Sequence, residues 1–142
     1  MHEQFRQIRT FLRHSERILG SMKRLMVTSS IEGEGKSFVA GNIAVSMANA
    51  GKKVVLIELD LYQPKLFDML DSDLEFGITD YLLGNATKEK ILGLTTIKNL
   101  YFVPAGNLIE SPSELLLSEK LSMFLNELDE EFDVLIIDTP PL

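Results

Sequence analysis

Two stretches of the chain are apolar at almost every position and have the length of a β-strand. They are Lys53–Leu59 (KVVLIEL) and Phe132–Asp138 (FDVLIID). A strand with one face in water alternates between polar and apolar residues, whereas a strand covered on both faces is continuously apolar. We therefore expect both stretches to be strands buried inside a sheet. Shorter apolar segments predict a first strand at about Arg24–Ser29 and another at Leu100–Val103.

Apolar residues at helical spacing separate these strands. After the first strand they predict a helix that ends near Ala50, where Gly51 stops it. Near the other end of the chain, Ser111 is expected to cap a helix, with Pro112 as its first residue and Glu114 as the reciprocal capping partner. The apolar positions that continue this helix are Leu117, Leu121, Phe124, Leu125 and Leu128. Further helical segments are expected at residues 2–18, 65–70, 77–84 and 88–93.

The alternation of strands and helices predicts an α/β fold, a doubly wound and mainly parallel sheet with helices on both faces. At 142 residues the chain has the size of a single domain, 1–142, with a helical segment at 1–20 ahead of the first strand. Sheets of this kind commonly continue beyond the last strand found here. We therefore expect a truncated or minimal version, with the sheet incomplete at the C-terminus.

A glycine-rich segment, VTSSIEGEGKS from Val27 to Ser37, connects the first strand to the first long helix. It follows the phosphate-loop pattern G-x-x-x-x-G-K-[ST], with Ser30 in place of the first glycine. The loop N–H groups and the positive end of the helix bind phosphate, the lysine contacts the β- and γ-phosphates, and the Ser37 hydroxyl ligates magnesium. The residues expected to contact the nucleotide are Ser30, Glu32, Gly33, Glu34, Gly35, Lys36, Ser37 and Phe38. The alternative is an ordinary strand-to-helix turn with a solvated lysine, but the flanking strand and helix favour a nucleotide site.

Acidic residues stand at the ends of both continuously apolar strands. Glu58 and Asp60 follow one of them, and Asp138 ends the other. Because the carboxyl ends of parallel strands face the ligand crevice, we expect these acids beside the phosphate loop. An apolar strand that ends in Asp is also how phosphate-loop enzymes hold magnesium through water, which assigns that role to Asp138. The alternative for Glu58 or Asp60, taken singly, is a solvated loop carboxylate.

The chain is acidic, but its charge is unevenly distributed. The net charge of −7 argues against non-specific binding to nucleic acid, which needs a basic surface. Residues 1–24 nevertheless carry six Arg and Lys against two Glu, and Glu3, Arg6 and Arg9 share one sector of the expected helix. This leader is expected to dock on acidic surface, such as that of a neighbouring subunit, or to lie near anionic lipid. The alternatives are a solvated helix and a helix folded back on its own subunit.

Two features that the sequence lacks indicate where in the cell the protein is expected. The chain contains no cysteine, which fits the cytoplasm, and it has neither a signal peptide nor an apolar run of membrane-spanning length.

Five segments in order carry a resemblance to a known family. They are EQFRQIR, SSIEGEGKS, LIELDLYQP, SPSELLLSEK and FDVLIIDTPP, and they extend from Glu3 to Pro141. In this order they resemble the bacterial tyrosine kinases of exopolysaccharide and capsule assembly. The resemblance implies an ATP-dependent protein-tyrosine kinase that uses ATP/ADP and Mg²⁺. It also implies a cytoplasmic homo-oligomeric ring at the inner face of the cell membrane, working with a membrane-spanning activator or chain-length-determinant domain.

The resemblance also assigns roles to residues. Lys36 and Ser37 match the family's phosphate and magnesium residues, and Asp138 matches the acid of its third motif. The implied catalytic set is Lys36, Glu58, Asp60 and Asp138, and the implied metal ligands are Ser37, Glu58, Asp60 and Asp138. Glu3, Arg6 and Arg9 match the family's E-x-x-R-x-x-R oligomerisation motif.

The chain departs from the family pattern in its second motif, usually Asp-x-Asp-x-Arg. Glu58 stands at the first aspartate, and Tyr62 stands at the arginine, which removes a cation. The family's tyrosine-rich tail is absent, since the only tyrosines are Tyr62, Tyr81 and Tyr101. A second function therefore remains open, that of a nucleotide-gated assembly or regulatory ATPase subunit similar to the partition and division-site ATPases. Those proteins typically have a second lysine at the position of Ile31, which argues against them.

Overall fold

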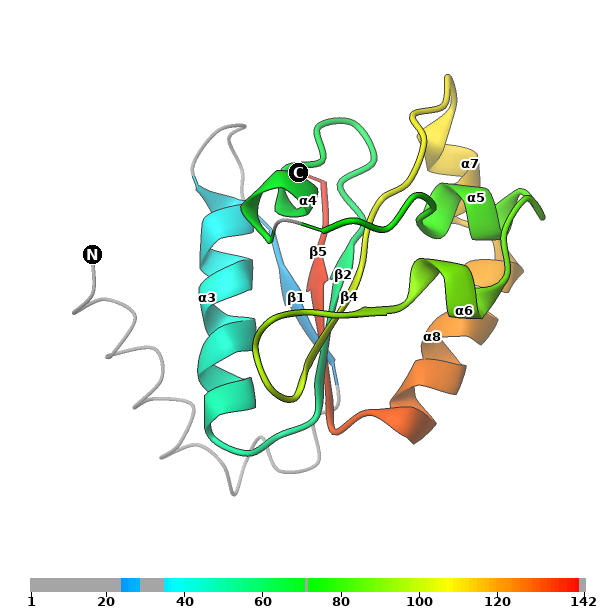
Figure 1. The fold of residues 1–142 in the computed structure, drawn as a ribbon. Helices are drawn as coiled ribbons and strands as arrows, with labels where there is room; N and C mark the ends of the chain where they lie inside the picture. Colours follow the sequence, from blue (N-terminus) through cyan, green and yellow to red (C-terminus); the bar gives the residue numbers. More distant parts are fainter. Residues whose placement is uncertain (1–23, 29–34, 71, 141–142) are drawn as a thin grey trace.

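The computed structural model describes residues 24–28, 35–70 and 72–140 (Figure 1). The helix expected at residues 2–18 lies outside this part of the chain. Among the described helices, none has both the length and the apolar character needed to cross a membrane.

A five-stranded sheet forms the centre of the described chain, with the spatial order β1-β5-β2-β4-β3. The strands are β1 (Arg24–Val27), β2 (Val54–Glu58), β3 (Gly93–Leu94), β4 (Leu100–Val103) and β5 (Val134–Asp138). The first four strands of the spatial order run parallel to one another, and β3 pairs antiparallel with β4. The expected α/β fold with a mainly parallel sheet is thus confirmed. The short strand β3 was not expected from the sequence.

Helices cover both faces of the sheet (Figure 1). The helices are α3 (Lys36–Asn49), α4 (Leu66–Met69), α5 (Ile78–Leu82), α6 (Lys88–Ile91), α7 (Pro112–Leu116) and α8 (Glu119–Glu131). Helix α3 packs on one face, with α4 beside its start, whereas α5, α6, α7 and α8 lie on the other side. The expected doubly wound arrangement is therefore present.

The hydrophobic core consists of two layers that share the strands. Val54 and Leu56 of β2 pack in the layer under α3, whereas Val55 and Ile57 pack in the layer under α8. Because successive side chains of a strand point to opposite faces, both layers draw on the same strand. This double burial explains why β2 and β5 are apolar at nearly every position, since all ten of their residues are buried.

The prediction of one continuous helix after Ser111 is wrong, because the structure has two helices there, α7 and α8. The expected helix is divided at Leu117, which is 87% exposed and ends α7. Ser118 starts α8, because its hydroxyl accepts a hydrogen bond from the backbone N–H of Leu121 at 3.3 Å. Ser111 does occupy the N-cap position of α7, but its side chain makes no capping hydrogen bond, so the expected capping box with Glu114 is absent.

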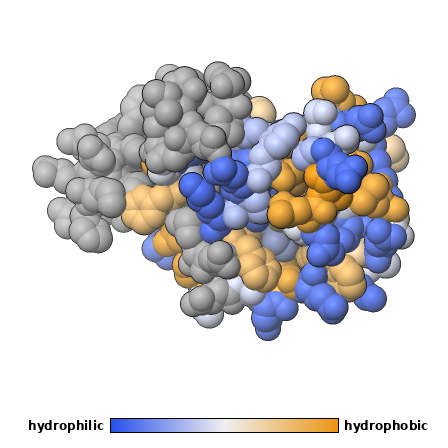
Figure 2. All heavy atoms as spheres, turned by 90° about the horizontal axis from the view of Figure 1, so that it is seen from above, coloured by the Kyte–Doolittle hydropathy of each residue, from blue (hydrophilic) through white to orange (hydrophobic). Residues whose placement is uncertain are grey.

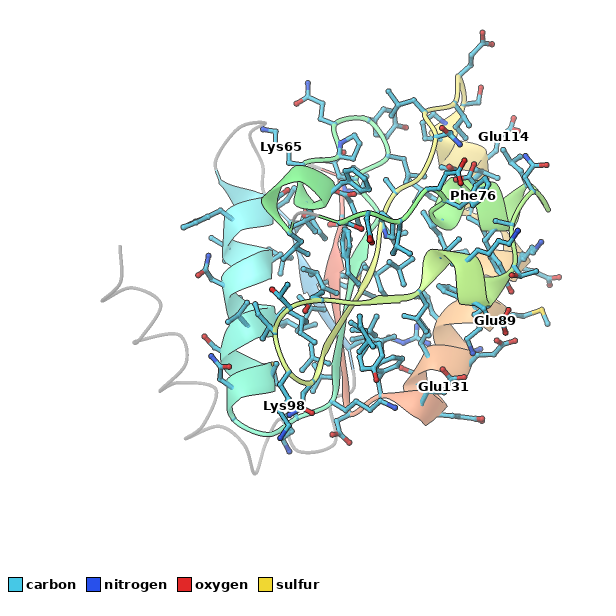
Figure 3. All side chains as sticks on the ribbon, in the orientation of Figure 1. Lys65, Phe76, Glu89, Lys98, Glu114 and Glu131 are labelled. Carbon is cyan, nitrogen blue, oxygen red and sulfur yellow. The ribbon has the colours of Figure 1, made fainter. Side chains whose placement is uncertain are left out.

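The side of the molecule away from α3 carries both acidic and exposed apolar residues. Figure 3 shows Glu89, Glu114 and Glu131 on the same side of the molecule as α6, α7 and α8, away from α3. Seen from the end at which the parallel strands finish, apolar residues gather over the side of α5 and α7 (Figure 2). Leu83, Leu108 and Leu117, which belong to the α5 and α7 regions, are all more than half exposed.

Candidate nucleotide-binding site

The site lies where the parallel strands end and α3 begins. Gly35, immediately before α3, has a φ of 76°, a left-handed conformation that glycine adopts without strain. Helix α3 has 14 residues and starts without a side-chain cap. The positive end of the helix dipole, at this first turn, favours an anion.

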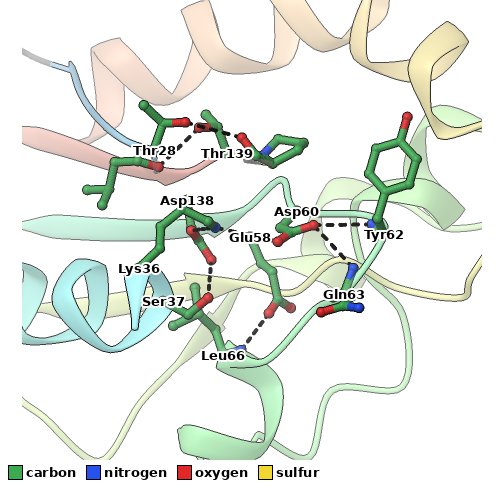
Figure 4. A network of polar contacts seen from close by, with 12 residues as sticks. Thr28, Lys36, Ser37, Glu58, Asp60, Tyr62, Gln63, Leu66, Asp138 and Thr139 are labelled. Atoms are coloured by element: carbon green, nitrogen blue, oxygen red, sulfur yellow. Dashed lines mark hydrogen bonds and ion pairs between the residues drawn. The ribbon is translucent and has the colours of Figure 1, made fainter. Parts of the chain in front are cut away.

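Two side chains from the first turn of α3 contact the carboxylate at the end of β5. The ammonium of Lys36 forms an ion pair with Oδ1 of Asp138, and the hydroxyl of Ser37 donates to Oδ2 at 2.8 Å (Figure 4). All three residues are buried. Asp138 pairs in register with Glu58 of the neighbouring strand and shares a face with Ile136, which packs under α3. The strand register therefore explains why this carboxylate meets α3.

Asp60 joins the same cluster from the loop after β2. Its Oδ2 atom lies 3.5 Å from Nζ of Lys36, so the lysine stands between two carboxylates. Its Oδ1 atom accepts the backbone N–H groups of Tyr62 at 3.3 Å and Gln63 at 3.1 Å (Figure 4). The loop is thus folded around Asp60, which holds the carboxylate at the crevice as the sequence predicts.

Glu58 is directed to a different set of partners. Its Oε2 atom accepts the N–H of Leu66 at 2.5 Å, and its Oε1 atom accepts the N–H of Ala105 at 3.1 Å. The residue is completely buried, and this burial raises the pKa of its carboxyl group, with the nearby charge of Asp138 adding to the effect. Both oxygens are occupied by backbone donors, so Glu58 ties α4 to the loop after β4. This arrangement differs from the base or metal ligand expected from the sequence.

Magnesium needs oxygen ligands and usually takes only one or two carboxylates from a protein, the remainder coming from phosphate and water. Within the described ranges, no three acidic or histidine side chains converge to hold a metal ion by themselves. The oxygens of Ser37 and Asp138, 2.8 Å apart, nevertheless form a hard donor set of the right chemistry beside Lys36. The residues present therefore fit a magnesium ion that arrives with a nucleotide, but not one held by protein alone.

A buried polar cluster next to the site was missed by the sequence analysis. Asp80 of α5 accepts the N–H of Gly77 at 2.9 Å and the side-chain amide of Asn107 at 2.8 Å. Thr79 donates its hydroxyl to the carbonyl of Asn107 at 2.7 Å. The cluster fixes the loop after β4 on α5. An available signal was the acid three residues after Gly77, a spacing typical of the first turn of a helix.

A pocket of about 270 Å³ lies between this loop and α4, with Glu58 in its wall. Its other lining residues are Pro64, Phe67, Leu74, Glu75, Phe76, Pro104, Ala105, Gly106 and Asn107.

Several residues expected in the site lie outside the described part of the chain. They are Ser30, Glu32, Gly33 and Glu34 of the loop, together with Glu3, Arg6 and Arg9 of the leader. Phe38 is described, in the first turn of α3, with 38% of its surface exposed.

The parallel sheet, the uncapped helix after a glycine turn and the lysine–serine–aspartate cluster define a nucleotide-triphosphate-binding fold of the phosphate-loop type. The chain belongs to the AAA domain family, whose family model matches residues 22–142.

The curated relatives are bacterial tyrosine kinases. The chain is 36% identical over 140 residues to the tyrosine-protein kinase YwqD of Bacillus subtilis (strain 168), covering 99% of this chain and 59% of the relative. It is 34% identical over 140 residues to the putative tyrosine-protein kinase CapB of Staphylococcus aureus, covering 99% and 61%. The resemblance seen in the sequence is thereby confirmed, and the chain spans about three fifths of the length of these relatives.

Solved structures agree with this assignment. The kinase domain of the Escherichia coli tyrosine kinase ETK matches with a TM-score of 0.89 and 27% identity, covering 98% of this chain and 54% of that one. The septum site-determining protein MinD of Pyrococcus horikoshii OT3, solved in complex with Mg-ADP, matches less well. Its TM-score is 0.74 at 26% identity, covering 84% of this chain and 49% of that one.

Proposed function

We propose that this chain is the ATP-binding part of a protein-tyrosine kinase of exopolysaccharide or capsule assembly, which transfers the γ-phosphate of ATP to tyrosine. The observation that carries the proposal is the buried contact of Lys36 and Ser37 with Asp138 at the start of α3. A cation, a hydroxyl and a carboxylate in this arrangement suit a nucleotide with its magnesium ion. The relatives that match almost the whole chain are named as tyrosine-protein kinases.

Each residue of the cluster takes a separate role in this proposal. Lys36 contacts the phosphates and stabilises the negative charge of the group being transferred. Ser37 and Asp138 would hold the magnesium ion, which would supply neutralisation of phosphate charge. Asp60 suits the role of base for the acceptor hydroxyl better than Glu58, because its Oδ2 atom lies 3.5 Å from Nζ of Lys36, whereas both oxygens of Glu58 are directed to backbone N–H groups of Leu66 and Ala105. The loop residues Ser30, Glu32, Gly33 and Glu34, with Gly35 and Phe38 of the α3 start, complete the proposed nucleotide contacts.

The experiment that tests this function offers an external acceptor. The chain is incubated with Mg-ATP and a glutamate–tyrosine copolymer, and phosphotyrosine is measured for the wild type, Lys36→Met and Lys98→Met. Lys98 is exposed and lies at the end of the molecule opposite Lys65 and α4, so it controls for the loss of one positive charge (Figure 3). We expect copolymer phosphorylation by the wild type and Lys98→Met but not by Lys36→Met. Equal signals from all three, or none from the wild type, would contradict the proposal.

The second candidate is a nucleotide-gated assembly or regulatory ATPase subunit. The observation that favours it is the similarity to MinD, which was solved with Mg-ADP. Binding of Mg-ATP without transfer to the copolymer would be the result expected for this alternative.

The proposal extends to assembly and location. Helices α7 and α8 carry six acidic residues against one lysine, Lys120, and this acidic side is complementary in charge to the basic residues Arg6 and Arg9 of a neighbouring subunit. With Glu3, these residues form the proposed oligomerisation motif, and a head-to-tail contact of this kind closes into a ring when the rotation allows. We further propose that the ring lies in the cytoplasm at the inner face of the cell membrane and works with a membrane-spanning activator domain.

A further inference from the structure

Two of the chain's three tyrosines are fixed by aromatic packing. The ring of Tyr81 lies 4.9 Å from that of Phe124, centroid to centroid, and the ring of Tyr101 lies 5.1 Å from that of Phe132. Both tyrosines pack against the core layer under α8. Moving either ring to the site of another molecule would break its aromatic pair and expose buried surface. Both tyrosines are therefore held in place by the fold.

Tyr62, in contrast to Tyr81 and Tyr101, has an exposed side chain. It is 55% exposed and lies in the loop after β2, two positions beyond Asp60. Its backbone N–H donates to Oδ1 of Asp60, which fixes the main chain at the rim of the nucleotide site. Figure 4 shows the Tyr62 ring pointing away from the cluster of Lys36 and Asp138. A fixed backbone with an exposed outward ring holds the phenol where a second molecule can reach it.

We propose that Tyr62 is a phosphoryl acceptor for a second copy of this chain. The proposal rests on the kinase function proposed above and specifies its substrate as a residue of the chain itself. Transfer between copies follows from the geometry, since the ring points away from the cluster of its own molecule. In the transfer, the bond from the γ-phosphorus to the β,γ-bridging oxygen breaks and a bond to the phenol oxygen of Tyr62 forms. ADP leaves with the bridging oxygen, and the phenol proton passes to a carboxylate at the site of the copy that carries ATP.

The first experiment locates the phosphate. The full chain is incubated with Mg-ATP, and phosphorylated peptides are identified by mass spectrometry for the wild type, Tyr62→Phe, Tyr81→Phe and Tyr101→Phe. We expect phosphate on Tyr62, and we expect Tyr62→Phe alone to reduce phosphotyrosine on the chain to the level of Lys36→Met. Circular dichroism and nucleotide affinity check that each variant is folded. Phosphate found only on Tyr81 or Tyr101 would overturn the proposal.

The second experiment tests transfer between copies. Tyr62→Phe, which retains the nucleotide site, is mixed with a mass-tagged Lys36→Met chain, which retains Tyr62. We expect phosphate on Tyr62 of the tagged chain. The proposal would be overturned if Tyr62 were phosphorylated in a sample of the wild type but not on the tagged chain in the mixture. That result would mean transfer within one molecule.

The copolymer assay distinguishes failure of the Tyr62 inference from failure of the proposed kinase function. Tyr62→Phe is expected to phosphorylate the copolymer as well as the wild type does, because the tyrosine serves as substrate. Copolymer phosphorylation together with an unmodified Tyr62 would refute this inference and leave the proposed function standing. Failure of the copolymer reaction in the wild type would refute both.

Discussion

Lys36 and Asp138 form an ion pair in which 6% of the lysine side chain and none of the aspartate side chain is exposed. Two charges so deeply buried depend on each other, because removing one partner of such a pair leaves the other without compensation at a cost of about 3–5 kcal/mol. In this chain the lysine is shared with Asp60, and the aspartate is shared with Ser37. The cluster is therefore held together by its own charges and hydrogen bond.

Replacing Lys36 by Met is expected to affect both binding and stability. It removes the cation proposed to face the phosphates, and charge-assisted contacts are among the strongest polar interactions. It also deprives Asp138 and Asp60 of the cation that they share. We expect Mg-ATP affinity to fall sharply in calorimetry and the urea midpoint to decrease. Lys98→Met is the matched control, and the site assignment would fail if the two variants kept the same nucleotide affinity.

Much of this site follows from the order of residues along the chain. Continuous apolarity identified β2 and β5, and the rule that parallel strands end at one edge of the sheet brought Asp60 and Asp138 to Lys36. The direction of Glu58 did not follow from that rule. Its side chain lies on the same face of β2 as Leu56, where it meets the N–H of Leu66 in α4. The sequence predicted a short helix after Pro64 but not the position in which it packs, so this contact could not be predicted.

The division of the helix at Leu117 could not be predicted from apolar spacing either. Leu117 stands four residues before Leu121 and thus fits the apolar spacing of α8. The hydroxyl of Ser118 nevertheless caps a new helix, and Leu117 is left exposed. Periodicity records which positions suit a buried face, but it does not record where a competing cap interrupts the helix. The antiparallel strand β3, with only two residues, is too short to produce a pattern.

The buried carboxyl group of Glu58 should give the protein a distinctive pH dependence. Burial, assisted by the charge of Asp138, raises its pKa in the folded state above its ordinary value of 4.5. Between that value and the raised one, the folded chain binds more protons at this position than the unfolded chain. Its contribution to stability is therefore fully present below the ordinary pKa and is lost as the pH rises through the raised pKa.

The comparison of the wild type with Glu58→Gln measures this effect. Urea midpoints are recorded from neutral pH down to the ordinary pKa of the carboxyl group, and the difference between the two proteins is taken at each pH. We expect the wild type to gain stability relative to the glutamine variant as the pH falls, since other acidic groups contribute equally to both. Asp73→Asn, at an exposed position, controls for the loss of one carboxylate. A difference that stays constant with pH would mean that Glu58 keeps its ordinary pKa.

The leader segment should act in assembly. Arg6→Ala combined with Arg9→Ala removes two of the basic charges proposed to meet the acidic side of a neighbouring subunit. We expect sedimentation to show a shift towards the monomer with nucleotide affinity nearly unchanged. High salt is expected to act in the same direction, because exposed charge pairs are screened. A wild-type chain that sediments as a monomer with nucleotide present, at about the concentrations used for calorimetry, would refute the assembly proposal.

The packing of Gly77 against the loop after β4 leaves no room for a side chain. A Cβ atom at Gly77 would lie 2.3 Å from the nitrogen of Gly106 and 2.4 Å from the carbonyl oxygen of Pro104. Both are backbone atoms, so relief requires the loop to move. The neighbouring N–H of Ala105 donates to Oε1 of Glu58, so movement of the loop should weaken that hydrogen bond. Gly77→Ala is therefore expected to lower stability by about 1–3 kcal/mol, the usual range for overpacking.

Gly84→Ala provides the matched control for this prediction. Gly84 has a φ of 82° but open space around the position of a Cβ, so alanine there is strained without meeting the loop. Both substitutions should destabilise the chain, and the total loss alone does not separate them. The discriminating measurement is a double-mutant cycle with Glu58→Gln. We expect strong non-additivity, and a smaller pH-dependent contribution of Glu58, in the Gly77→Ala background, whereas the effects of Gly84→Ala and Glu58→Gln should add. Additivity in both backgrounds would show that the loop does not transmit the clash to Glu58.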